Sequence, residues 1–186
     1  MRKVEISSHK REWSLMFEEE SKQLKNILGT LVINVFHIGS TAIPNIQAKP
    51  VIDILIEVTC LSEVDKFNYQ FEQLGYRVHG ENGIPNRRYF SKGGNNRTHH
   101  VHIFEQGNPE ITRHLAFRDY MIAHPKEAQN YSQLKQTLAD KYPNSIEMYI
   151  EGKNDYIKTI DYKAAKWEKL TNCSDEGFNA TEIKKN

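Results

Sequence analysis

The sequence predicts an α+β fold: a small mixed β-sheet with helices on one face and a helical C-terminal half. Apolar residues recur at helical spacing over residues 10–28 and 61–74, and again through most of the chain after Pro109. Short β-branched runs at 31–36 and 51–58 are typical of strands. Helices and strands thus fall in separate groups instead of alternating strictly, which favours the α+β class.

In the N-terminal half, residues 10–28 place Glu and Lys between the apolar positions and reach Gly29, a usual helix stop. The strand at 31–36 is followed by a loop, and the strand at 51–58 is aliphatic apart from two acids. Residues 61–74 carry apolar side chains on one face, which predicts a second helix.

The second half begins with a short strand at 76–79. A hairpin is indicated because residues 87–91 and 98–104 read as strands and flank a Gly- and Asn-rich turn at 93–96. Prolines then divide the helical remainder of the chain. Helices are predicted over 110–123, 125–141 and 145–170.

Length and composition indicate one globular domain, residues 1–170, followed by a polar C-terminal tail, residues 171–186. The chain has 186 residues, 26% of them charged, and 25 Lys and Arg against 24 Asp and Glu. This balance argues against a protein that coats nucleic acid through bulk charge. Two distant cysteines and a charged N-terminus without a signal peptide lead us to expect a cytoplasmic protein, and no membrane-spanning segment is predicted.

The first candidate site is the run His37-Ile38-Gly39-Ser40-Thr41, which follows a predicted strand. Glycine lets backbone N–H groups approach an oxyanion, hydroxyls add donors, and a helix starting after Thr41 would add its N-terminal dipole. The alternative is an ordinary strand-to-helix turn with a Ser or Thr cap.

The second candidate is Asp53 with Glu57. Alternate residues of a strand share a face, so both acids point away from the aliphatic side of the strand. An acid in the middle of an apolar strand is costly unless it is paired, bound to a ligand or part of a site, which favours a functional role for Asp53. For Glu57, near the strand end, a solvated position is an equal alternative.

The third candidate is the hairpin, because residues 82–104 contain basic residues and histidines but no acid. His100 and His102 share one face of their strand. They could bind a metal ion, or contact phosphate together with Arg88, and Lys49 could add to this basic surface. The alternative is a polar sheet face with exposed histidines.

Two further basic residues lie in the helical half. Arg118 sits next to Asp119 among apolar residues, a setting more typical of a structural ion pair than of a ligand contact. Lys153 follows Gly152 and could point back at the sheet, although a solvent-facing lysine is the simpler interpretation.

Taken together, these motifs resemble the signature of the GrpB-like family. The resemblance is carried by the 37–44 and 48–54 runs and by Arg97-Thr98-His99-His100-Val101-His102. It continues through residues 117–120, 124–125, 131, 134–135 and 152–153, and so covers about residues 10–170. The family is assigned to the nucleotidyltransferase superfamily fold, and some members are fused to dephospho-coenzyme A kinase.

The resemblance implies a nucleotide or phosphate site. In active nucleotidyltransferases, a Gly-Ser turn precedes two carboxylates two residues apart on a strand, and a third carboxylate from a later strand completes a site for two Mg²⁺ ions. Gly39, Ser40 and Asp53 match this pattern, but Leu55 occupies the partner position. His100 and His102 lie where the third carboxylate is expected.

We therefore expect a nucleotidyltransferase-like protein that binds a nucleotide or phosphorylated small molecule, with Mg²⁺ or Mn²⁺ and metal-dependent nucleotidyl or phosphoryl transfer. The expected metal and catalytic residues are Asp53, Glu57 and His102. The expected phosphate-binding residues are His37, Gly39, Ser40, Thr41, Lys49, Arg88, His100, Arg118 and Lys153. Two alternatives stay open: a non-catalytic anion-binding module, and a transition-metal hydrolase using His37, Asp53, His100 and His102.

Overall fold

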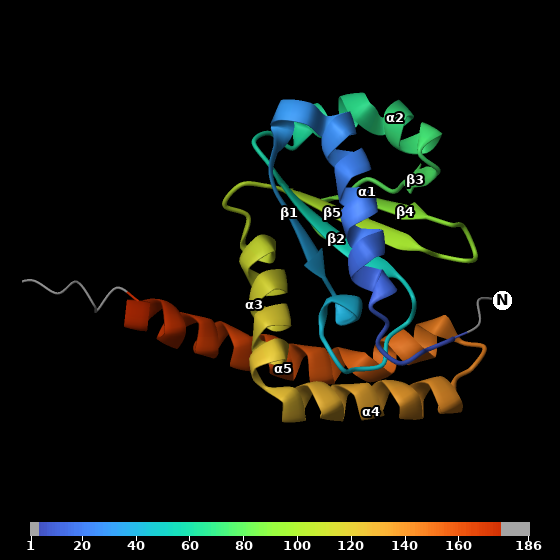
Figure 1. Ribbon diagram of the computed structural model, residues 1–186, viewed down its shortest axis with the longest axis vertical. Coiled ribbons are helices and arrows are strands. Elements are labelled where there is room, and N and C mark those ends of the chain that lie inside the picture. The colour runs from blue at the N-terminus through green and yellow to red at the C-terminus, as the bar shows by residue number, and fades with distance from the viewer. Residues whose placement is uncertain (1–3, 176–186) are drawn as a thin grey trace, which may run out of the picture.

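The computed structural model describes the backbone of residues 4–175 and the side chains of residues 4–171. Its centre is a five-stranded mixed sheet in the order β1-β2-β5-β4-β3 (Figure 1). The strands are β1 (Val32–Ile38), β2 (Ile52–Val58), β3 (Tyr76–Val78), β4 (Arg88–Lys92) and β5 (His99–Glu105). β2 runs parallel to β5 and antiparallel to β1, and β4 is antiparallel to both of its neighbours. The predicted mixed sheet and the β4–β5 hairpin are confirmed.

The α-helices are α1 (Glu12–Leu28), α2 (Asn68–Gln73), α3 (Pro109–Ala123), α4 (Pro125–Lys141) and α5 (Ile146–Asp175). In Figure 1, α1 crosses one face of the sheet, while α4 and α5 lie side by side below its end and α3 joins the two parts. The helical C-terminal half is confirmed, although α5 continues five residues beyond the predicted end, so the start of the predicted tail is helical. Residues 176–186 of that tail lie outside the described residues.

Two other predicted helices differ in the structure. The helix predicted over residues 61–74 is divided into a 3-10 helix, η3 (Ser62–Phe67), and α2. The helix expected after Thr41 is a single 3-10 turn, η2 (Ser40–Ala42), and Ile43 is already extended. Because proline disfavours helical backbone in the residue before it, Pro44 explains why this helix ends so early.

The main core lies between the sheet and the helices α1 and α2. The aliphatic side of β2, formed by Ile52, Ile54, Ile56 and Val58, is completely buried there, as the strand alternation predicts. Trp13 and Leu24 of α1 and Phe71 of α2 pack against this side. The face of the sheet that carries Asp53 therefore points the other way, toward α3 and the lower helices.

The opposite face of the sheet is covered in part by α3. Leu55 and Phe104 pack there against Ile111 of α3. Ile43 and Ile46, in the loop after η2, insert into a separate apolar cluster between α3, α4 and α5. This loop and α3 together hold the helical layer against the ends of β1 and β2.

None of the described helices is long and apolar enough to span a membrane.

Candidate functional site

A cavity of about 320 Å³ lies where the start of β2 and β5 meets η2, α4 and α5. Its described lining residues are Ser40, Thr41, Lys49, Val51, Asp53, His100, Lys135, Ile146, Tyr149, Ile150 and Lys153. Five elements (η2, β2, β5, α4 and α5) and the loop before β2 contribute to it. Three of these residues are lysines and one is an acid, so the wall carries an excess of positive charge.

The lysines are held among aromatic rings. The Nζ atoms of Lys49 and Lys153 lie 4.3 Å and 4.8 Å from the centroid of the Tyr149 ring. Lys135 is 2% exposed, donates a hydrogen bond to the carbonyl oxygen of Gln47 and has its Nζ 4.6 Å from the Tyr131 centroid. Burial, reinforced by the charge of Lys153, lowers the pKa of Lys135 to about 7. These contacts hold the lysine side chains in place. The contacts of Lys135 are with a carbonyl oxygen and an aromatic ring, and not with an acid.

Asp53 forms the acidic part of the wall. Its Oδ1 accepts a hydrogen bond from Nδ1 of His100 at 2.9 Å, and Nε2 of His102 lies 4.0 Å away. Burial disfavours the ionised carboxyl, but the contacts with His100 and His102 outweigh it and hold the pKa of Asp53 well below its usual range. Behind Asp53, Gly39 has a φ of 71°, and a Cβ there would come within 2.4 Å of Oδ2. Glycine at this turn is therefore required by the close approach of the carboxylate.

The η2 turn supplies two hydroxyls to the cavity. The Thr41 hydroxyl donates to the carbonyl oxygen of Val51 at 3.3 Å, and Nε2 of His37 lies 2.9 Å from Oγ1 of Thr41. His37 lies on the α1 side of β1, where its ring stacks on Phe17. Burial lowers the pKa of His37 to about 4, so the ring is neutral and orients Thr41 from behind. Ser40 lines the cavity directly.

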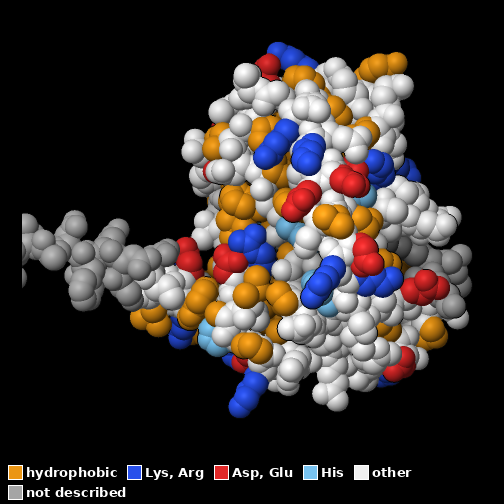
Figure 2. Space-filling view, viewed as in Figure 1, with side chains coloured by type: hydrophobic (Ala, Val, Ile, Leu, Met, Phe, Trp, Pro, Cys, Tyr) orange, Lys and Arg blue, Asp and Glu red, His pale blue; other side chains and the backbone are white. Residues whose placement is uncertain are grey.

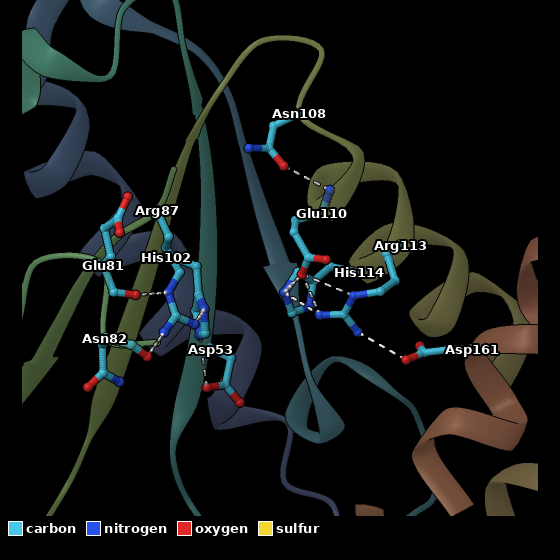
Figure 3. A network of polar contacts seen from close by, with 10 residues as sticks. All are labelled: Asp53, Glu81, Asn82, Arg87, His102, Asn108, Glu110, Arg113, His114 and Asp161. Carbon is cyan, nitrogen blue, oxygen red and sulfur yellow. Dashed lines mark hydrogen bonds and ion pairs between the residues drawn. The ribbon is translucent and has the colours of Figure 1, made fainter. Parts of the chain in front are cut away.

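A buried polar network continues from Asp53 toward α3 (Figure 3). Arg87 is anchored by the carbonyl oxygens of Glu81 and Asn82, and its Nη1 lies 3.4 Å from Nδ1 of His102. The His102 ring faces the ring of His114 with 5.5 Å between centroids. Arg87 thereby fixes the ring that faces the Asp53 carboxylate.

The far end of this network joins α3 to α5. Arg113 is bonded to Glu110 at 2.8 Å and to Asp161 of α5 at 3.2 Å. Burial lowers the pKa of His114 to about 3, with the charge of Arg113 acting in the same direction. His114 is therefore neutral, and Arg113 is paired with Glu110 and Asp161. This end of the network connects the helices α3 and α5.

The structure brings most of the predicted site residues together. Ser40, Thr41, Lys49, Asp53, His100 and Lys153 line the cavity. Gly39 and His102 do not line the cavity, but both lie next to the Asp53 carboxylate. Lys153 lines the cavity. The simpler interpretation, a lysine that faces solvent, is therefore wrong.

Four predicted residues are placed elsewhere. Glu57 accepts a hydrogen bond from Asn34 at 2.8 Å, and four residues along a strand separate it from Asp53 by about 13 Å. Arg88 points to the α1 and α2 side of the sheet, where it forms a two-pronged ion pair with Asp65. Arg118 bonds to Asp119 and to the carbonyl oxygen of His37, which agrees with the structural alternative. His37, as described above, lies behind the strand.

The residues around Asp53 do not fit a two-metal centre. Among residues 4–171, no three His, Cys, Asp or Glu side chains converge closely enough to hold a metal ion. The position two residues after Asp53 is Leu55, which is in the core, and Glu57 is too distant. The alternative transition-metal set is also divided, because His37 lies on the other side of the sheet.

Lys135, Tyr149 and Arg87 belong to the site or its support, but sequence reasoning missed them. A signal for Lys135 was present: buried residues of α4 recur at 128, 131, 135, 138 and 139, so a lysine stands at a core position of an amphipathic helix. Arg87 directly precedes β4 and Arg88 begins it, and neighbouring residues of an extended segment point to opposite faces. Which of the two faces the site therefore depends on strand register.

The comparisons with known proteins agree with this architecture. The family model described as "GrpB protein" matches residues 3–163. "UPF0157 protein YqkA" of Bacillus subtilis is 53% identical over 171 residues, which cover 92% of this chain and 50% of that protein, so the chain spans half the length of this relative.

Among solved structures, the crystal structure of conserved protein GrpB from Enterococcus faecalis matches with a TM-score of 0.86 at 44% identity, covering 88% of this chain and 99% of that one. A structure of Cid1 in complex with its short product ApU matches with a TM-score of only 0.39 at 11% identity, covering 78% and 48%, and carries no argument here. The chain belongs to the GrpB family.

Proposed function

We propose that the lysine-lined cavity binds a nucleotide or another phosphorylated small molecule. The observation that carries this proposal is the convergence of Lys49, Lys135 and Lys153 on a wall whose one described acid, Asp53, is already paired with His100. An anion in the cavity would add a favourable partner for this cluster of basic side chains.

Burial strengthens such an interaction. Charges that are partly removed from water attract one another more strongly than exposed charges do. Lys135 is almost completely buried, and its Nζ is bonded to a backbone carbonyl oxygen and not to a carboxylate. Ser40 also lines the cavity, where its hydroxyl can form a hydrogen bond with a ligand.

A second cavity of about 320 Å³ supports a ligand larger than phosphate. It shares Lys49 and Val51 with the first cavity, and its other lining residues are Glu5, Pro50, Asn95, Asn96, Arg97 and Thr98. Amide side chains can both donate and accept hydrogen bonds, as recognition of a nucleobase or sugar requires. A molecule with an anionic end and a polar end fits the two cavities together.

The proposed function is binding, and not the metal-dependent transfer expected from the resemblance. Transfer through two metal ions needs paired carboxylates, and the strand that carries Asp53 has Leu55 at the partner position. The lysines remain as the groups that would hold the phosphate.

The test is calorimetric titration with ribonucleoside mono- and triphosphates and with pyrophosphate. We expect Lys153→Gln to weaken binding roughly tenfold, the equivalent of about 1.4 kcal/mol. Lys158→Gln is the matched control, since Lys158 lies on the same helix with a side chain 77% exposed. No binding of any of these anions by the wild-type protein, or equal binding by both variants, would overturn the proposal.

A further inference from the structure

We infer that the cavity takes its phosphorylated ligand as a metal-free anion, with the lysine side chains in the place of divalent cations. This inference rests on the proposed function and makes it more specific: it names the ionic form of the ligand. It follows from the state of Asp53, from the absence of convergent ligands near it among the described residues, and from the distribution of charge around the cavity.

One oxygen of the Asp53 carboxylate is already engaged by a histidine, and the other lies close to the η2 turn. Oδ1 accepts from His100 at 2.9 Å and faces His102 at 4.0 Å. Oδ2 is packed against Gly39 so closely that even a Cβ on that residue would lie 2.4 Å away. A metal ion bound at Oδ1 would have to displace His100.

Further oxygen ligands are also missing from the described neighbourhood. Mg²⁺ prefers octahedral coordination by oxygen and usually takes one or two carboxylates from the protein. The residues next to Asp53 on its strand are Ile52 and Ile54, both completely buried on the other face. Along the same face, Leu55 belongs to the core and Glu57 is bonded to Asn34.

The cations of the wall point to the same conclusion. Three lysines and one carboxylate line the cavity, and Arg87 contacts His102 next to that carboxylate. Such a wall repels a divalent cation and attracts an anion. The neutralising charge that a metal ion supplies elsewhere can thus come from Lys135 and Lys153.

The experiment measures ATP and pyrophosphate binding to the full chain by calorimetry, once in EDTA and once in excess Mg²⁺. Chelated Mg²⁺ cancels part of the ligand's negative charge, so we expect binding to be roughly tenfold tighter in EDTA. Titration with Mg²⁺ or Mn²⁺ alone should give no binding heat. Binding that requires Mg²⁺, or a tight site for either ion alone, would overturn the inference.

The variant Asp53→Asn gives a second test, because a metal site and a free-anion site predict opposite effects on binding. If Asp53 is a metal ligand, this variant loses binding; if the cavity takes a free anion, it binds ATP in EDTA at least as tightly as the wild type, because the acid of the wall has been removed. A thermal unfolding curve verifies that the variant is folded. Loss of ATP and pyrophosphate binding in EDTA by the folded variant would contradict the inference.

The two proposals fail in different ways. If neither ATP nor pyrophosphate binds in either condition and the nucleotide panel also gives no binding, the proposed function fails and the inference with it. If binding occurs only with Mg²⁺, the inference fails and the proposed function stands.

Discussion

Lys135 occupies a position that the helical pattern of α4 reserves for apolar side chains. It is completely enclosed, and burial together with the charge of Lys153 lowers its pKa to about 7. A buried lysine without an acidic partner costs stability, and such a cost is usual where a protein binds a ligand. The residue therefore connects the energetics of the fold with the proposed anion site.

This lowered pKa predicts how the free energy of unfolding varies with pH. In the unfolded chain Lys135 titrates near 10.5, so between about pH 7 and 10 the unfolded state binds the extra proton and stability rises with pH. The contribution is at most about 1.4 kcal/mol per pH unit, and it vanishes below pH 7, where both states are protonated. Urea unfolding from pH 6 to 10 should show this rise in the wild type and a smaller one in Lys135→Met. A Lys158→Met control should keep the full slope; an equal slope in Lys135→Met would contradict the prediction.

Gly39 allows a second test at the residue scale. Its positive φ and the 2.4 Å approach to Asp53 both disfavour a side chain. Gly80 has a φ of 61°, but a Cβ there would meet no atom within 4 Å. Gly39→Ala should therefore lower the free energy of unfolding by about 1–3 kcal/mol more than Gly80→Ala, measured by urea denaturation. Equal losses would show that the contact with Asp53 is not the cause.

At the scale of the elements, α1 is fastened to the sheet by a buried charge cluster. Glu20 of α1 is 5% exposed, accepts a hydrogen bond from the Tyr76 hydroxyl at 2.9 Å and pairs with Lys92 at 2.8 Å. Its partners come from β3 and β4, so one side chain ties the helix to the edge of the sheet. The helical pattern of residues 10–28 shows the apolar stripe of α1 but gives no sign of this acid among its buried residues.

Removing Glu20 should leave Lys92 without its charge partner in a half-buried position. We expect Glu20→Ala to reduce the free energy of unfolding by about 3–5 kcal/mol. Glu63→Ala is the control, because Glu63 pairs with Lys66 on the surface and such pairs contribute about 0–1 kcal/mol. A loss from Glu20→Ala no larger than that of the control, in thermal or urea unfolding, would refute the role assigned to the cluster.

The positions of helices and strands could be predicted from the sequence where the spacing of apolar residues determines them. The two 17-residue helices α1 and α4 and the strand β2 have clear patterns, and their observed bounds lie within two residues of the predicted ones. η2 ends early because Pro44 disfavours helical backbone in the residue before it. The expectation of a helix after Thr41 did not take this local effect of proline into account. The division of the helix over residues 61–74 has no such local explanation.

At the scale of the whole molecule, charge is balanced overall and concentrated locally. Figure 2 shows basic, acidic and histidine side chains interspersed over the viewed face, without a large block of one sign. This agrees with the near-neutral composition and gives this face no resemblance to a nucleic-acid-binding surface. The positive excess lies instead at the junction of sheet and helical layer, where α4 and α5 bring two of the lysines to the sheet.

The sequence by itself determined the α+β class, the aliphatic side of β2 and the hairpin, and it singled out the turn at Gly39 and Asp53 as a candidate site. These follow from local periodicity and from the cost of an acid in an apolar strand, which need no knowledge of distant neighbours. The tertiary structure alone decided that Arg87 and not Arg88 supports the site, that Glu57 is remote from Asp53, and that Lys135 joins Lys49 and Lys153. Strand register and helix packing set those relations, because they depend on contacts between residues up to about a hundred positions apart.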